Sequence, residues 1–250
     1  GVLGAGAQLI KFSMRTPRWK IFDFVLTSGR LGITDEYVEA NAREILRHFP
    51  NAGPERDAAK RTWIEGIRAA ELGNSDAVLG VDVSRLLGYP FYDNRLSGTK
   101  RIVSGDEIDS FYYTLKAFMQ NSPIDMAFVP LQGDPNHDHF AVTRIAGEVL
   151  SRLSWENGVD IPIAFYASPW FTGKKPVNAF YYHQPSKDFV DAFPAAYSSQ
   201  AAYAEAGREL ISGLNPALMN EFLDYDPDGY HPIAEGFIIQ TAADLKLEIR

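Results

Sequence analysis

The residues best suited to chemistry lie in one short polar segment, residues 134–139. It follows an apolar stretch at 125–130 that is typical of a buried strand, and an amphipathic helix follows it directly. Asn136 or Asp138 can cap that helix, which places His139 in or just before its first turn. The positive end of the helix dipole disfavours imidazolium, so His139 is expected to stay neutral, the form that binds metals. The segment therefore predicts a metal ligand, and a solvated helix cap is the alternative interpretation.

The helix expected after His139 has a continuous apolar stripe, because its apolar residues recur at spacings of three and four. Ligands of open α/β sheets gather at the carboxyl ends of strands, and residues 134–139 occupy such a place. The stripe consists of Val142, Ile145, Ala146, Val149, Leu150 and Leu153.

The rest of the chain alternates between strand and helix patterns. This alternation predicts an α/β fold with a mostly parallel sheet covered by helices on both faces. No repeat or linker indicates a second domain, so residues 1–250 are expected to form one domain. The predicted strands are 21–26, 125–129 and 161–166; the predicted helices are 38–48, 57–72, 111–119 and 190–214, with a helix tail and short strand at 77–87 and a strand or helix at 237–249.

Composition excludes some partners. A net charge of -8 and a pI near 5.2 argue against nucleic acid. No apolar run approaches the roughly 18 residues that span a bilayer. The chain has no cysteine, which rules out disulfides and thiolate metal sites. A start at Gly1 suggests processing or truncation, so the compartment stays open with the cytoplasm slightly favoured. Nothing indicates the oligomeric state.

Two other patterns compete for a functional interpretation. Residues 4–9 resemble the start of a dinucleotide-binding Gly-x-Gly-x-x-Gly motif, but Leu9 replaces the third glycine. The carboxylate expected after the second strand is also missing, because Thr27 and Ser28 stand there. A dinucleotide-dependent oxidoreductase is therefore the third choice. The aromatic stretch at 168–194 could face a substrate, although ordinary packing is slightly favoured.

Several short motifs follow one another in a recognisable order over residues 1–237. They are Gly-Val-Leu-Gly-Ala-Gly at 1–6, Val-Leu-Thr-Ser-Gly at 25–29, Arg-Ala-Ala-Glu at 68–71 with Val-Leu-Gly-Val at 78–81, Leu-Gly-Tyr-Pro at 87–90 with Asp93, Asn-His-Asp-His at 136–139, and Tyr-Ser-Ser-Gln at 197–200. In order and spacing they resemble the motifs of the PIG-L/LmbE-like zinc-dependent N-deacetylases.

The resemblance implies a Rossmann-like three-layer sandwich and a zinc hydrolase that removes an acyl group, usually acetyl, from an amino sugar or related conjugate. His139 matches the last zinc ligand of the family. The opening His-Pro-Asp-Asp box, which supplies the family's other two ligands and its general base, would lie upstream of Gly1. The first strand would be absent with it.

The resemblance also implies roles for other residues. Asn136 stands where many members have histidine, and its amide can donate a hydrogen bond to an oxyanion but cannot act as a general acid. Asp138 would orient a neighbouring ligand or cap the helix. Arg68, with Glu71 three residues later, would meet the substrate, the alternative being a solvated ion pair within a helix. Asp93 would line the pocket rim, the alternative being a turn aspartate with no function.

Without a general acid at position 136, protonation of the leaving amine would fall to the upstream carboxylate or to His137. A different class remains open beside the enzyme. A member that has lost catalysis would bind carbohydrate in the same cleft, with Trp170, Tyr181 and Tyr182 as stacking surfaces.

Overall fold

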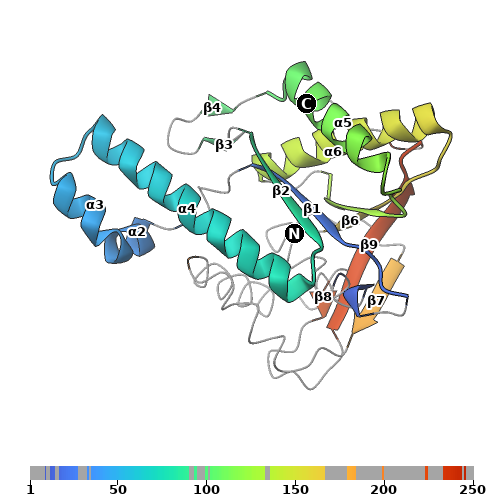
Figure 1. Cartoon of the computed structure of the whole chain (residues 1–250), viewed down its shortest axis with the longest axis horizontal. Coiled ribbons are helices and arrows are strands. Elements are labelled where there is room, and N and C mark those ends of the chain that lie inside the picture. The colour runs from blue at the N-terminus through green and yellow to red at the C-terminus, as the bar shows by residue number, and fades with distance from the viewer. Residues whose placement is uncertain are drawn as a thin grey trace. The chain divides into compact units, whose positions relative to one another are not determined.

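The chain divides into two compact units, each built around its own sheet. Unit 1 comprises residues 1–8, 91–184 and 210–250, and unit 2 comprises residues 9–90 and 185–209. That residues 1–250 act as one domain stays a prediction. The computed structural model (Figure 1) describes residues 9, 12–14, 17–27, 33, 35–89, 93–94, 99–100, 102–132, 136–166, 179–183, 199, 223–224, 233–243 and 245.

Unit 2 contains a pair of parallel strands and three helices. Strand β1 (Phe22–Thr27) pairs with β2 (Val83–Tyr89) in a register that sets Phe22 opposite Val83. Helices α2 (Asp35–Asn41), α3 (Arg43–His48) and α4 (Pro54–Leu79) lie between the two strands in the chain. Because parallel strands need a crossover connection, the helical segment between them is the expected link.

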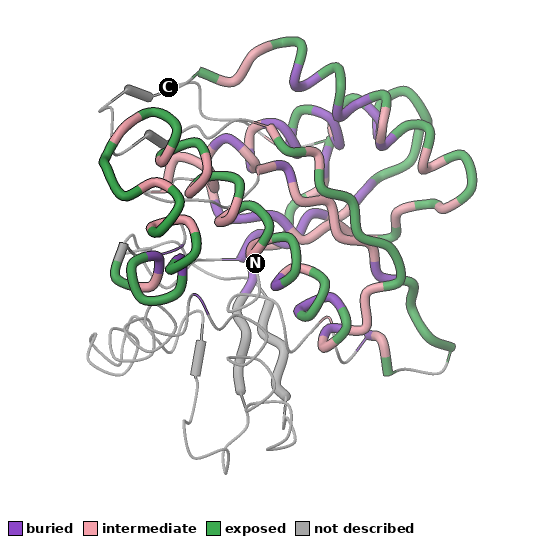
Figure 2. Tube along the Cα trace, turned by 60° about the vertical axis from the view of Figure 1, so that its left-hand side comes forward, coloured by how far each residue is buried: buried purple, intermediate pink, exposed green. Residues whose placement is uncertain are grey.

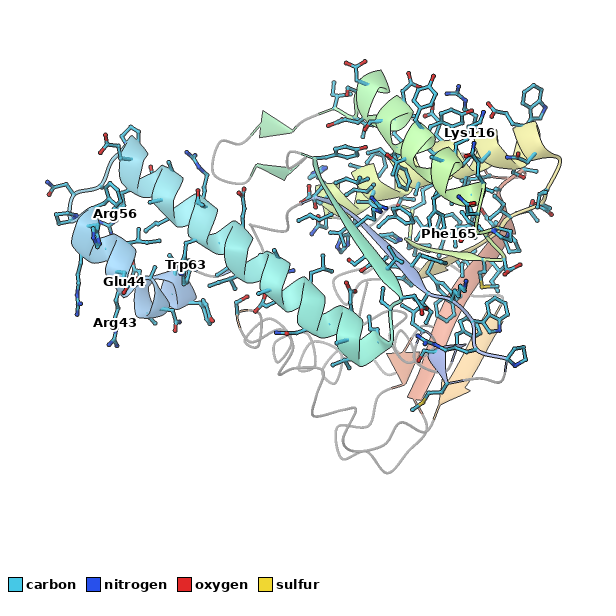
Figure 3. All side chains as sticks on the ribbon, viewed as in Figure 1. Arg43, Glu44, Arg56, Trp63, Lys116 and Phe165 are labelled. Carbon is cyan, nitrogen blue, oxygen red and sulfur yellow. The ribbon has the colours of Figure 1, made fainter. Side chains whose placement is uncertain are left out.

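Helices α2 and α3 form where the sequence predicts one helix at 38–48, so that prediction is wrong at one point. The helix is interrupted at Ala42, whose φ of -84° and ψ of 33° depart from helical values. Ala42 is buried with Ile33 and Val38, and Trp63 of α4 packs against this cluster (Figure 3). The bend thus follows from tertiary packing, which local periodicity does not encode.

Helix α4 is longer than the predicted 57–72 because its ends carry helix boundary signals. Pro54 occupies the first turn, where its missing N–H costs nothing. Gly80 ends the helix with a left-handed φ of 70°. A Cβ at this position would come within 2.8 Å of the Ser13 side chain, so glycine is required both by conformation and by space.

Unit 1 contains a five-stranded sheet in the order β5-β6-β9-β7, with β8 also pairing with β9. Only β5 and β6 are parallel, and all pairings of β9 are antiparallel. Strand β7 ends the order, and β7 and β8 lie on opposite sides of the first half of β9, because Ala234 and Glu235 pair with both strands. The five strands are β5 (Ala127–Pro130), β6 (Pro162–Tyr166), β7 (Ala179–His183), β8 (Leu223–Asp224) and β9 (Ile233–Thr241), and a separate hairpin joins β3 (Asp93–Asn94) to β4 (Thr99–Lys100).

Helices α5 (Gly105–Met119) and α6 (His137–Asn157) pack against each other in unit 1 (Figure 1). Helix α5 begins earlier than the predicted 111, because Ser104 and Glu107 form a capping box. The predicted stripe of α6 is confirmed, although Val142 is only half-buried: Ile145, Val149 and Leu153 are fully buried. Figure 2 marks such buried positions in purple.

A cluster of polar contacts around the buried Tyr112 also joins α5 and α6. The Tyr112 hydroxyl donates to Glu156 at 2.5 Å, and Lys116 donates both to that hydroxyl at 2.6 Å and to Glu156 at 2.9 Å. Arg152 lies over the Tyr112 ring, 3.7 Å from its centroid. The donors from Tyr112, Lys116 and Arg152 lower the pKa of Glu156 to about 2.

The observed elements confirm the α/β class, with parallel pairings in both units. The late antiparallel strand β9 resolves the choice left open for residues 237–249, of which 237–241 are strand. Apart from Ser199, the helix predicted at 190–214 lies outside the described residues, as does most of the aromatic stretch at 168–194. None of the described helices has the length and apolar character needed to cross a membrane.

Candidate functional site

The first turn of α6 lies directly after strand β5, as the sequence predicts. The hydroxyl of Thr143 donates at 2.8 Å to the Pro130 carbonyl at the end of β5 and lies at 2.8 Å from the His139 carbonyl in the helix. Leu131 donates its backbone N–H to the Tyr166 carbonyl at 2.7 Å, which continues the parallel pairing beyond β5. These bonds fix the start of the helix against the carboxyl edge of β5 and β6.

Asn136 caps this helix, which decides between the two caps that the sequence allows. Its side-chain oxygen accepts from the backbone N–H groups of Asp138 at 2.9 Å and His139 at 3.4 Å. Since that oxygen is engaged in the cap, any contribution of the Asn136 amide to a reaction would come from its N–H groups.

His137, Asp138 and His139 occupy the first turn, and all three are partly buried. The structure thus brings Asn136, Asp138 and His139 together in unit 1. Asp138 lies near the positive end of the helix dipole, where a carboxylate stabilises the helix whether or not it also orients a ligand.

A second group of functional candidates lies in unit 2, on α4. Arg68 donates from Nη1 to Oε2 of Glu71 at 2.6 Å. Ser199 donates its backbone N–H to Oε1 of Glu71 at 2.7 Å, and its hydroxyl lies 2.7 Å from Oε2. The Arg68 and Glu71 side chains are 16% and 5% exposed, so the pair is not the solvated ion pair of the alternative interpretation.

Ser199 was not singled out by sequence reasoning, although it belongs to the recognised Tyr-Ser-Ser-Gln motif. Its partner Glu71 is 128 residues away, and no local pattern links the two. Asp93 lies in β3, opposite Lys100 of β4, and its side chain is outside the described part of the chain. Its assignment to a pocket rim therefore stays a prediction.

A pair of carboxyl groups in unit 2, one partly buried and one buried, was also missed. Asp23 lies on β1, and Asp76 lies near the end of α4 and is 7% exposed. Burial and the Asp76 carboxylate together raise the pKa of Asp23 to about 6, and burial raises the pKa of Asp76. The available signal was an aspartate flanked by Phe22 and Phe24 in an apolar strand.

A metal would need more ligands than these groups supply. Within the described part of the chain, no group of three or more His, Cys, Asp or Glu side chains is arranged to hold an ion. His139 is one imidazole, whereas a catalytic zinc ion takes three protein ligands. The described residues therefore do not by themselves make up a zinc site.

No protein-family model matches the chain, and no curated protein matches it in sequence. Solved structures do resemble it. N,N'-diacetylchitobiose deacetylase from Pyrococcus horikoshii, in complex with an inhibitor, superposes with a TM-score of 0.58 at 18% identity, covering 96% of this chain and 79% of that one. The zinc-inhibited form of teicoplanin deacetylase Orf2 gives 0.55 at 12% identity, covering 98% and 95%.

A third similar structure is the conserved protein TT1542 from Thermus thermophilus, with a TM-score of 0.54 at 18% identity over 94% of this chain and 87% of that one. At these identities the comparison defines the fold. The chain has the mixed α/β fold of solved deacetylases, with parallel strands and flanking helices in common.

Proposed function

We propose that this protein is a zinc-dependent hydrolase of the PIG-L/LmbE-like type, which removes an acyl group from the amide nitrogen of an amino sugar or a related conjugate. The observation that carries the proposal is the position of His139, in the first turn of α6 directly after strand β5. The likeness to solved deacetylases supports it.

At the start of α6, two residues would act at the metal and the N-cap residue would act on the substrate. His139 would be a zinc ligand, with Asp138 orienting a neighbouring ligand and the N–H groups of Asn136 donating to the developing oxyanion. Zinc, when bound, supplies a water of lowered pKa and polarises the amide carbonyl. The proposal requires further zinc ligands besides His139.

The substrate is proposed to be a small molecule that carries sugar hydroxyls. Arg68 would bind it, because a guanidinium presents a rigid fork of donors to hydroxyls or phosphate. Asp93 would contribute at the rim of the pocket. The conjugate attached to the sugar and the number of subunits are not part of the proposal.

The test is zinc content together with acetate release from N-acetylglucosamine conjugates. The wild-type protein is expected to bind about one zinc per chain. His139→Ala is expected to lose both zinc and turnover while its thermal unfolding changes little, because a side chain in the first helical turn carries little core packing.

His137→Ala is the matched control for metal content, since it removes an imidazole two positions away in the same turn. It should keep its zinc. Full zinc content in His139→Ala would overturn the ligand assignment. A zinc-free wild-type protein that binds sugar without turnover would favour the non-catalytic carbohydrate-binding alternative, and a retained nicotinamide cofactor would favour the oxidoreductase.

A further inference from the structure

Glu71 is the centre of a buried polar cluster formed by Arg68, Glu71 and Ser199. Three donors reach its two oxygens: the Ser199 backbone N–H at Oε1, and both the Ser199 hydroxyl and the Arg68 guanidinium at Oε2. Glu71 is 4% exposed and Ser199 is 3% exposed, so water contributes little to this carboxylate. A buried carboxylate is stable only when it is paired and hydrogen-bonded in this way.

The geometry separates the roles of Arg68 and Glu71. Both oxygens of Glu71 already accept hydrogen bonds from within unit 2. A carboxylate used in this way is poorly suited to accept further bonds from a sugar. Its charge and its short bond to Nη1 instead determine where the planar fork of Arg68 points.

We propose that Glu71 and Ser199 are positioning residues that hold Arg68 in the orientation that binds the substrate. This inference rests on the proposed function, in which Arg68 binds the substrate, and deepens it. Glu71 acts through the guanidinium, and Ser199 acts through Glu71 by fixing its carboxylate plane with two bonds.

The two bonds from Ser199 differ in how a substitution affects them. The backbone N–H bond to Oε1 survives any side chain at position 199, whereas the bond to Oε2 needs a hydroxyl. Ser199→Ala therefore loosens the carboxylate without removing its anchor, so the fold should persist. Ser199→Thr keeps a hydroxyl and should behave like the wild-type protein.

Steady-state kinetics on an acetylated amino sugar give the first measurement. A loosened Arg68 weakens ground-state and transition-state binding alike, so Ser199→Ala should raise KM by about 3- to 10-fold with kcat nearly unchanged. Glu71→Gln should raise KM further, because it also removes the ion pair. Ser75→Ala, a buried serine on the same helix four residues after Glu71, is the control and should leave KM unchanged.

NMR relaxation of the Arg68 side chain gives a measurement that needs no turnover. In the wild-type protein the Arg68 Nε–H should be rigid on the nanosecond timescale, and in Ser199→Ala and Glu71→Gln it should become mobile. Ser199→Thr and Ser75→Ala should both keep it rigid. A purely structural role for Ser199 would alter thermal unfolding and leave the Arg68 relaxation as it was.

The two measurements distinguish failure of this inference from failure of the proposed function. If Arg68→Ala raises KM while Ser199→Ala and Glu71→Gln change neither KM nor the Arg68 mobility, the positioning roles are wrong and the deacetylase remains. If the wild-type protein hydrolyses no acetylated amino sugar, the proposed function is wrong, and the Arg68 relaxation alone decides whether Glu71 and Ser199 position it.

Discussion

Helices α4 and α6 are the longest in the described part of the chain, and their fully buried residues differ in kind. Over 21 residues α6 buries a mainly apolar side against the sheet of unit 1. Over 26 residues α4 buries only Glu71, Ser75, Asp76 and Leu79, three of which are polar or charged. Helix α6 is thus placed mainly by removal of apolar surface from water, whereas α4 adds specific polar contacts near its end to the partly buried apolar contacts of Trp63, Ile64 and Ile67.

The kind of residue that each helix buries determines which substitutions it tolerates. Apolar packing has no preferred direction and depends on volume, so similar apolar residues can replace one another in α6. Buried polar groups depend on particular partners, and loss of one partner leaves the other uncompensated. The polar contacts of α4 are therefore harder to replace than the apolar contacts of α6. They include the contact of Arg68, the candidate substrate-binding residue.

The largest effect is expected from opening a cavity beneath α6. Leu153 is fully buried, so Leu153→Ala should lower the free energy of unfolding by about 2 to 5 kcal/mol. Urea denaturation monitored by circular dichroism measures the change. Trp155→Ala, two residues along the same helix at a side chain that is 85% exposed, is the control and should change it by less than about 0.5 kcal/mol. Equal losses would contradict the apolar account of α6.

A smaller, pH-dependent effect is expected from the carboxyl groups of Asp23, which is partly buried, and Asp76. The pKa of Asp23 rises from 3.8 to about 6 on folding. Below about pH 4 Asp23 is protonated in both the folded and the unfolded state, so its ionisation costs the folded state no free energy. Above about pH 6 Asp23 is ionised in both states, and the folded state bears the full free-energy cost of the ionised carboxylate. Stability should therefore fall as pH rises through this window.

Asp23→Asn should remove this loss and stabilise the protein at pH 8 by the order of 1 to 3 kcal/mol. Urea denaturation at pH 4 and at pH 8 measures the difference between variant and wild type. Asp160→Asn, at an exposed aspartate, should leave the difference between the two pH values as it is in the wild type. If Asp23→Asn were less stable at pH 8, burial of the ionised Asp23 carboxyl would not be a cost.

The smallest effect on the free energy of unfolding is expected at the start of α6, where a polar cap takes the place of apolar packing. Asn136→Ala removes the acceptor for two backbone N–H groups and should cost about 1 kcal/mol of unfolding free energy. Asn136→Asp keeps an acceptor and should cost little. An equal loss in both variants would mean that Asn136 stabilises the helix by something other than its cap.

The same contrast explains how much the sequence could predict. The stripe through Ile145, Val149 and Leu153 is a local pattern, so α6 and the placement of His139 after a strand followed from it. The break at Ala42 did not, because packing against Trp63 decides it. In the candidate site, Arg68 and Glu71 could be paired from their spacing, but the bond between Glu71 and Ser199 joins residues too distant in the chain for any periodicity to show.

Strand β9 sets an order of events for the growing chain. Its second half pairs with β6, with Ile163 opposite Gln240, so residues 167–232 must be synthesised before that edge of β6 is covered. Until then a nascent chain that has already formed the β5–β6 pair exposes unpaired N–H and C=O groups beside the apolar residues of β6. Such long-range pairing is slow to form, so the period of synthesis between β6 and β9 is when unit 1 is most exposed to aggregation.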